Sequence, residues 1–104
     1  MSNRYEAPIR DMQFALYDVL GVDRVLPALG HEETGRELVD AVLEEAARFA
    51  GTVLAPLNEV GDREGCSLDK STGEVKTPTG FRQAYEQYVE GGWPGLTAPA
   101  EFGG

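Results

Sequence analysis

The usual catalytic arrangements of residues are missing from this sequence of 104 residues. The one histidine, His31, could act as a general base, but Glu32 and Glu33 beside it predict an exposed loop. The one cysteine, Cys66, could act as a nucleophile, but it lacks a flanking basic residue that would activate the thiol. We therefore expect His31 to be solvated and Cys66 to be a small buried or half-buried side chain.

Three acids close together in the sequence, Asp62, Glu64 and Asp69, are candidate ligands for a metal ion. A calcium-binding loop needs a glycine at its sixth position and a glutamate at its twelfth, and counting from Asp62 or from Asp69 meets neither requirement. The glycines near the end of the chain match neither the dinucleotide-binding pattern nor the phosphate-binding loop with its lysine. We expect no catalytic residue, no cofactor-binding residue and no metal site in this sequence.

The charge balance excludes several classes of partner. Nine Lys and Arg residues against eighteen Asp and Glu give a net charge of −9, which disfavours binding to nucleic acid or to anionic membrane surfaces. No apolar run is long enough for a membrane span, and the first residues lack the apolar segment of a secretory signal. A single cysteine forms no internal disulfide. These features predict a cytoplasmic protein without membrane insertion.

Apolar periodicity predicts a mostly α fold with about three main helices, at roughly 9–20, 34–55 and 78–90. The length allows one domain, so we expect residues 1–104 to form a single domain. Gly21 is expected to end the first helix. The apolar residues of that helix are expected to share a buried face: Met12, Leu16, Val19 and Leu20.

The second helix carries the strongest pattern. Thr34 and Glu37 have the spacing of a capping box, which predicts the start of the helix. Its other side, including Asp40, is expected to face solvent, with Glu44 and Arg48 forming an ion pair. A broad apolar stripe is wide enough to require burial against at least two partners. The stripe comprises Leu38, Val39, Val42, Leu43, Ala46, Phe49, Ala50, Val53 and Leu54.

Prolines are expected to interrupt helices at two points. The proline of residues 22–27 permits at most a single helical turn there, and Pro56 ends or kinks the second helix. Residues 58–78 have the composition of turns. Within them, 66–69 and 74–77 are expected to pair as a small β-hairpin in an otherwise long loop.

The third helix is expected to have Pro78 at its first position and to end at Gly91 and Gly92. The last stretch, 91–104, is rich in glycine and proline yet carries large apolar side chains. This composition predicts an irregular loop that packs against another part of the protein.

Five short pieces of the sequence form an ordered pattern. They are Tyr5-x-Ala7-Pro8-x-x-Asp11-Met12-x-Phe14-x-Leu16; Leu43-Glu44-Glu45-Ala46-Ala47-Arg48-Phe49-Ala50; Val53-Leu54-Ala55-Pro56-Leu57-Asn58 with Gly61-Asp62; Thr77-Pro78-x-Gly80-Phe81 with Tyr85; and Gly91-Gly92-Trp93-Pro94-Gly95-Leu96 with Pro99-x-x-Phe102-Gly103-Gly104. In order and spacing these pieces resemble the opening of one subgroup of acyl-CoA dehydrogenases, the larger bacterial members with an extra N-terminal segment and an extra C-terminal domain. The resemblance spans nearly the whole chain.

Members of that family have an N-terminal helical domain, a middle β domain and a C-terminal four-helix bundle, with FAD held between the last two and the bundle of a neighbouring subunit. The resemblance therefore implies a homo-oligomeric, FAD-dependent enzyme. It would remove the α-proton and β-hydride of an acyl-CoA thioester and pass electrons to an electron-transfer flavoprotein. Both a straight-chain fatty acyl-CoA and a sulfur-containing one, such as 3-methylthiopropanoyl-CoA, remain open as substrates.

The sequence departs from the family at Gly104, where it stops before the family's catalytic glutamate, most flavin contacts and the bundle. What remains resembles the first part of the N-terminal helical domain, so we expect the chain alone to be inactive and to bind no flavin. Phe102 is the one candidate for substrate contact, because its loop leads into the helices that wall the acyl chain. A plain apolar anchor for the loop is the favoured alternative for Phe102. Apolar surface left open by missing domains is expected to make the chain self-associate.

Two other functions fit the composition. A stand-alone acidic helical protein, derived from the same family, would act as a dimeric interaction or regulatory module. A ligand-binding module for CoA thioesters is disfavoured because the sequence has no basic cluster to meet the CoA phosphates.

Overall fold

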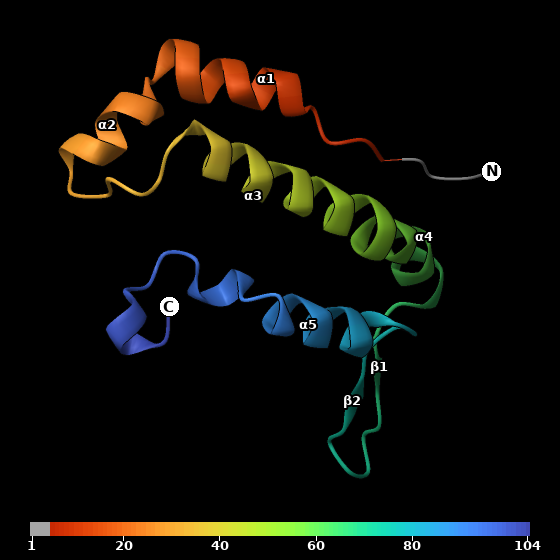
Figure 1. Ribbon diagram of the computed structural model, residues 1–104. Helices are drawn as coiled ribbons and strands as arrows, with labels where there is room; N and C mark the ends of the chain where they lie inside the picture. Colours follow the sequence, from red (N-terminus) through yellow and green to blue (C-terminus); the bar gives the residue numbers. More distant parts are fainter. Residues whose placement is uncertain (1–4) are drawn as a thin grey trace. The chain divides into compact units, whose positions relative to one another are not determined.

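The computed structural model describes residues 5–104, which are mostly helical with one small hairpin (Figure 1). This architecture confirms the predicted fold class. The elements are α1 (Ile9–Gln13), η1 (Phe14–Val19), α2 (Val22–Ala28), α3 (Arg36–Phe49), η2 (Ala50–Leu54), α4 (Ala55–Glu64), β1 (Ser67–Leu68), β2 (Val75–Lys76), α5 (Phe81–Glu90), η3 (Trp93–Gly95) and η4 (Ala100–Phe102). The chain divides between Ala55 and Pro56 into two compact units, each described here by itself. No described helix has the length and apolar character needed to cross a bilayer.

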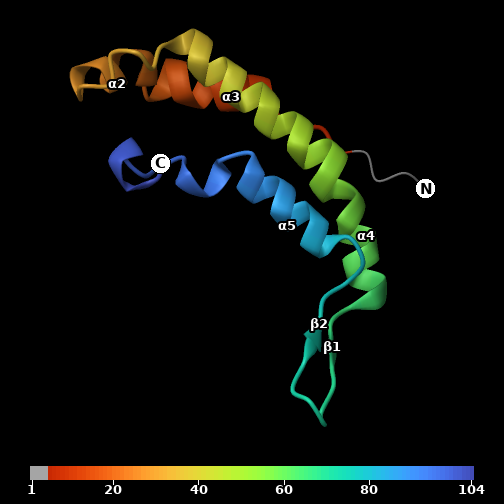
Figure 2. The same cartoon turned by 60° about the horizontal axis from the view of Figure 1, so that its bottom comes forward.

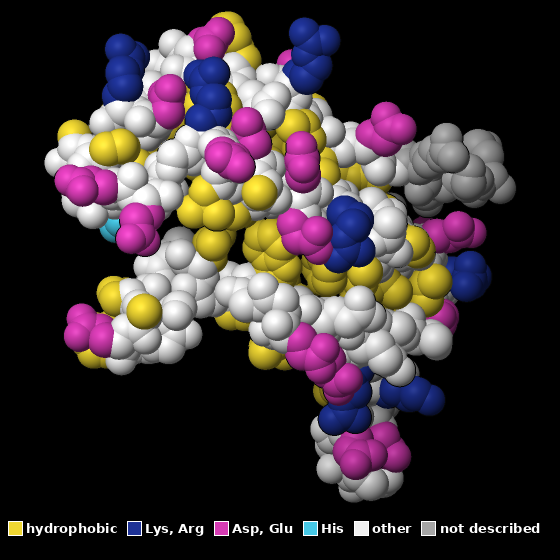
Figure 3. Space-filling model, in the orientation of Figure 1, with side chains coloured by type: hydrophobic (Ala, Val, Ile, Leu, Met, Phe, Trp, Pro, Cys, Tyr) yellow, Lys and Arg dark blue, Asp and Glu magenta, His cyan; other side chains and the backbone are white. Residues whose placement is uncertain are grey.

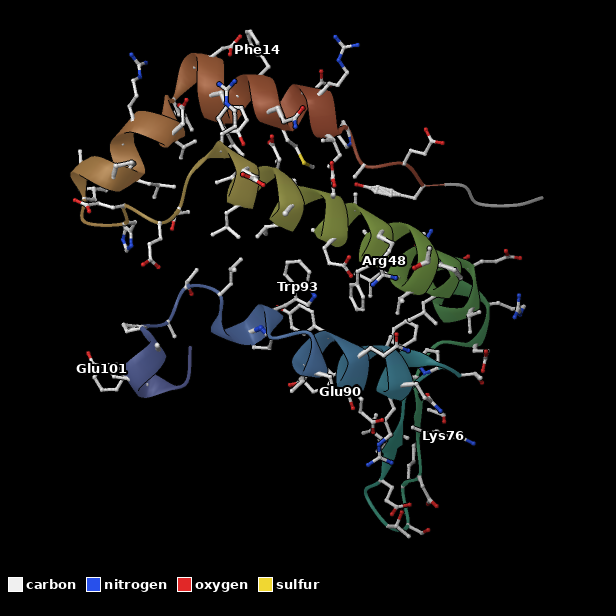
Figure 4. The ribbon with its side chains drawn as sticks, viewed as in Figure 1. Phe14, Arg48, Lys76, Glu90, Trp93 and Glu101 are labelled. Carbon is white, nitrogen blue, oxygen red and sulfur yellow. The ribbon has the colours of Figure 1, made fainter. Side chains whose placement is uncertain are left out.

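The first predicted helix is present, but its buried face is not the expected one. The turn η1 is a π-helix, in which the Leu20 N–H donates to the carbonyl of Ala15 at 3.0 Å. A π-turn holds more residues than an α-turn, so side chains after α1 rotate away from the 3.6-residue stripe. Val19 and Leu20 are consequently exposed, while Tyr17 is buried on the side shared with Gln13. Phe14, at the start of this turn, points away from α3 (Figure 4).

The segment after Gly21 forms a longer helix than predicted. Gly21 adopts a left-handed conformation with φ of 62°, and its carbonyl accepts from the N–H of Val25 at 3.0 Å. The helix α2 includes Pro27. Pro27 has no N–H and so cannot make the backbone hydrogen bond of a helical residue. Because α2 ends one residue later, at Ala28, the loss is confined to the end of the helix.

The start of α3 differs from the predicted capping box. Gly35 is the residue before the helix, in an extended conformation, and no side chain caps the helix there. The Val39 N–H donates to the Gly35 carbonyl at 3.1 Å. The helix therefore begins later than the capping box requires, which puts Thr34 outside the capping position. The expected Glu44–Arg48 pair is also wrong, because Arg48 instead pairs with Glu45, three residues before it.

Pro56 does not end the second helix. Backbone from Arg36 to Glu64 is helical throughout, so the prediction of turns from residue 58 is wrong for 58–64. In a regular α-helix the ring of Pro56 would clash with a carbonyl of the preceding turn. That preceding turn is the π-turn η2, which is wider than an α-turn. The wider turn explains why the helix continues through the proline.

The predicted hairpin is confirmed. Strands β1 and β2 pair antiparallel with Ser67 opposite Lys76 and Leu68 opposite Val75. The turn is closed by the Gly73 N–H, which donates to the carbonyl of Asp69 at 2.7 Å. Figures 1 and 2 both show the hairpin projecting beyond α5 of the same unit.

Within the second unit, α4 and α5 meet at a glycine. A Cβ at Gly61 would lie 2.8 Å from Cζ of Phe81, so the ring occupies the space that a side chain would need. The Thr79 hydroxyl donates to Oε1 of Glu64 at 2.8 Å, beside the same contact. The helix α5 starts at Phe81, three residues later than predicted, because Pro78 to Gly80 form a turn instead. It ends at Gly91 and Gly92 as expected.

The last stretch is irregular, as predicted, and folds back on itself. The Gly104 N–H donates to the carbonyl of Pro99 at 3.0 Å, and a Cβ at Gly95 would lie 3.1 Å from the carbonyl of Gly103. Leu96 and Phe102 are exposed. This segment therefore forms two short 3-10 turns with its largest apolar side chains outward.

Replacing Gly61 by valine should destabilise the second unit by roughly 1–3 kcal/mol, because the added methyl groups displace the ring of Phe81. Asn58→Val is the matched control on the exposed side of the same helix, where we expect a change within about 1 kcal/mol. Denaturant unfolding of both variants measures the difference. Equal stabilities would show that Gly61 is not a packing requirement.

Candidate functional site

The polar residues that the structure brings together lie in the first unit, and we call them the polar junction: Gln13, Tyr17, Asp23, Arg36 and Asp40. Tyr17 comes from η1, and its hydroxyl lies 2.5 Å from Oδ1 of Asp40 and 3.1 Å from the carbonyl of Arg36. A phenol has one proton, and the carboxylate is the stronger acceptor. The hydroxyl therefore donates chiefly to Asp40, which joins η1 to α3.

The remaining members surround this hydrogen bond. The Gln13 amide nitrogen donates to the same Oδ1 of Asp40 at 3.0 Å. The guanidinium of Arg36 lies over the ring of Tyr17, 4.1 Å from its centroid, and contacts Oδ2 of Asp23 at 3.5 Å. The junction thus combines a cation–π contact with charge-assisted hydrogen bonds. It connects α1, η1 and α2 to the start of α3.

Burial raises the pKa of Tyr17 to about 12, and the hydrogen bond to the Asp40 carboxylate adds to the rise. A phenol with so high a pKa stays protonated at neutral pH and is a poor general base. The oxygen of Asp40 nearest to it already accepts from two donors of the chain. The geometry is that of a structural tie between helices, with no position for a reacting group.

Sequence reasoning missed this junction. Asp40 was expected on the solvent-facing side of its helix, and it is half-buried instead. The usable signal was two pairs at a spacing of four, Gln13 with Tyr17 and Arg36 with Asp40, which place donors and acceptors on facing sides of two helices. The π-turn over 14–19 left no such signal.

The other residues singled out in the sequence lie apart from one another. His31 is exposed in a turn, as predicted. Cys66 is exposed, which corrects the expectation of a buried thiol, because it directly precedes a hairpin whose strands are exposed on both faces. Over residues 5–104, no three His, Cys, Asp or Glu side chains come together in a way that could hold a metal ion.

Phe102 lies in the turn η4 and is 77% exposed. Trp93 is half-buried. A Cβ added at Gly91 would lie 2.8 Å from Nε1 of its indole, so the indole packs against the backbone of Gly91. Of the two aromatic residues of this segment, Trp93 is the less exposed, and the ring of Phe102 is available to another surface.

Two of the grooves on the described surface border aromatic side chains and lie outside the polar junction. One, of about 690 Å³, runs along β2 and the first turn of α5, with Lys76 and Arg82 beside Phe81 and Tyr85. The other, of about 550 Å³, lies in the first unit where Tyr5 crosses Gly51. Figure 3 shows Lys or Arg side chains at the hairpin, next to carboxylates. Both grooves are open, and neither combines a nucleophile with a base.

Tyr17→Phe keeps the ring under Arg36 but removes the hydroxyl, so the free energy of unfolding should fall by roughly 1–3 kcal/mol at neutral pH. The pKa of Tyr17 is raised above its ordinary value of 10, so its stabilisation is complete below pH 10 and is lost as pH rises toward about 12. The difference in free energy of unfolding between wild type and Tyr17→Phe should therefore disappear as the pH rises from 10 toward about 12. Denaturant unfolding at several pH values measures it, with Tyr85→Phe as the control at an exposed tyrosine. A gap that stays constant up to pH 12 would contradict the raised pKa.

The sequence was compared with known proteins. No protein-family model matches it. Three curated relatives do: a 3-methylmercaptopropionyl-CoA dehydrogenase of Ruegeria pomeroyi, 40% identical over 96% of this chain; a broad-specificity linear acyl-CoA dehydrogenase of Mycobacterium tuberculosis, 33% identical over 98%; and a butyryl-CoA dehydrogenase of Syntrophomonas wolfei, 30% identical over 85%. The aligned part is 17%, 17% and 15% of their respective lengths. Over nearly its whole length, the chain is therefore related to a segment of the acyl-CoA dehydrogenases.

Proposed function

We propose that this chain is the first part of the N-terminal helical domain of an FAD-dependent acyl-CoA dehydrogenase. The observation that carries the proposal is 40% identity over 96% of the chain to a relative named 3-methylmercaptopropionyl-CoA dehydrogenase. The mostly helical structure with its small hairpin supports it. The intact enzyme would remove two hydrogens across the α,β-bond of an acyl-CoA thioester. The names of the relatives include both a sulfur-containing and a straight-chain acyl group, so both substrate classes stay within the proposal.

The residues described here do not fit a flavin site. The groove along β2 is open and has two cations, Lys76 and Arg82, of which Arg82 lies 3.9 Å from Oε1 of Glu86. In the polar junction the side chains hydrogen-bond to one another. A dinucleotide cofactor requires backbone N–H groups or cations turned toward its phosphates, as at a glycine-rich helix start. We therefore derive no chemical step from these residues, and their proposed role is to hold helices in place.

The partners of the intact enzyme follow from the same proposal. They are an acyl-CoA substrate, an electron-transfer flavoprotein and further copies of the same subunit. Within this chain Phe102 is the residue proposed to face the acyl group. Its exposure favours this role over that of a core anchor, because a ring 77% open to solvent contributes little to packing.

The chain by itself is expected to bind no FAD and to show no acyl-CoA dehydrogenation. Titrating the purified protein with FAD while following flavin fluorescence and absorbance should show no change, and butyryl-CoA with an artificial electron acceptor should give no turnover. Circular dichroism on the same sample establishes that the helices are formed.

Stoichiometric flavin on the folded chain would overturn the assignment of residues 5–104 as scaffold. Flavin binding only by a longer polypeptide that includes this segment is the outcome that the proposal requires.

A further inference from the structure

The outer edge of β2 is the feature that the proposed function leaves unused. The Asp69 N–H donates to the carbonyl of Glu74 at 2.8 Å, so this carbonyl faces β1, while the Glu74 N–H donates to Oγ1 of Thr72 at 3.3 Å. In an antiparallel ladder successive residues turn their N–H and C=O groups to opposite sides. The N–H and C=O of Val75 therefore face away from β1, on the open edge of the hairpin.

This edge has space beside it. The groove of about 690 Å³ is lined by residues 75–78 of β2 and its continuation and by residues of α5. None of the residues that line it belongs to β1. Val75 is 64% exposed, and Leu68, its partner across the hairpin, is 59% exposed. An open edge with a donor, an acceptor and an apolar pair is a template for another strand.

The sequence of the edge is self-complementary. If Val75 is placed opposite Val75 of a second copy in antiparallel register, each N–H meets the other copy's C=O, because both point outward. The same register places Glu74 opposite Lys76 of the second copy, and Lys76 opposite its Glu74. Opposite charges directly across an antiparallel pair stabilise it. In Figure 4 the side chain of Lys76 extends outward from the hairpin.

In this register, side chains of like character also meet on each face of the resulting sheet. Leu68 and Val75 share one face of the hairpin, so the register forms a continuous apolar row of Leu68, Val75 and their two equivalents. Lys76 and Glu74 share the other face, where the charges alternate across the interface. A two-fold axis through the Val75 pair generates all of these contacts at once, as an isologous interface requires.

We propose that β2 pairs with β2 of a second copy of this chain, centred on Val75, to form a four-stranded antiparallel sheet. The partner is a second copy because the edge carries both halves of each ion pair. The proposal does not depend on the dehydrogenase assignment. The paired segment is short, so the interface is small and the dimer is weak.

Sedimentation equilibrium of the full chain at physiological ionic strength tests this pairing. Lys76→Glu places two acids opposite one another and should raise the dimer Kd about tenfold. Glu74→Lys should do the same with two cations. The double variant Glu74→Lys with Lys76→Glu restores opposite charges and the original net charge, so it should restore the wild-type Kd.

Lys70→Glu is the matched control, since it makes the same charge change at the tip of the hairpin, outside the proposed pair. In wild type, amide exchange at Val75 should slow as the protein concentration rises, because that N–H donates to the second copy. A monomer at every concentration up to the millimolar range would overturn the proposal. A dimer that responds equally to Lys76→Glu and Lys70→Glu would also overturn it, since the copies would then meet elsewhere.

Discussion

The hydrogen bond between the Tyr17 hydroxyl and the Asp40 carboxylate is the tie that orders the first unit. Tyr17 lies four residues after Gln13, so helical spacing places both side chains on the side that faces Asp40. Once the ring is inward, Arg36 covers it and holds Asp23 of α2. One side-chain contact thereby fixes the direction of three helical segments that are each too short to be stable alone.

In the second unit, the helices are held by a close steric contact, where the first unit has a hydrogen bond. Gly61 leaves room for the ring of Phe81, and this contact places α5 and the hairpin that leads into it. Several chemistry-bearing side chains of the described chain are used in such ties or lie exposed and apart. This distribution is the one that the proposed role of holding helices in place requires. The chain aligns with 17% of the length of two of its relatives.

The sequence was sufficient for the features that depend on local periodicity and turn chemistry. The hairpin around Gly73 and the end of α5 at Gly91 lie where they were predicted. The features it did not predict depend on backbone geometry that no residue type marks. A π-turn before Pro56 allows the helix to continue through the proline, and another leaves Val19 and Leu20 exposed. Asp40 has the residue type of a solvated face, and only the tertiary partner reveals its role.

The central claim is the proposal that these residues are the helical front part of an acyl-CoA dehydrogenase. The most direct test is the DNA sequence that follows codon 104 in the genome of origin. The proposal predicts that the reading frame continues past Gly104 with further glycines and reaches, much later, a glutamate within a predicted helical bundle. A stop codon directly after Gly104 would contradict it and would favour a stand-alone dimeric interaction module.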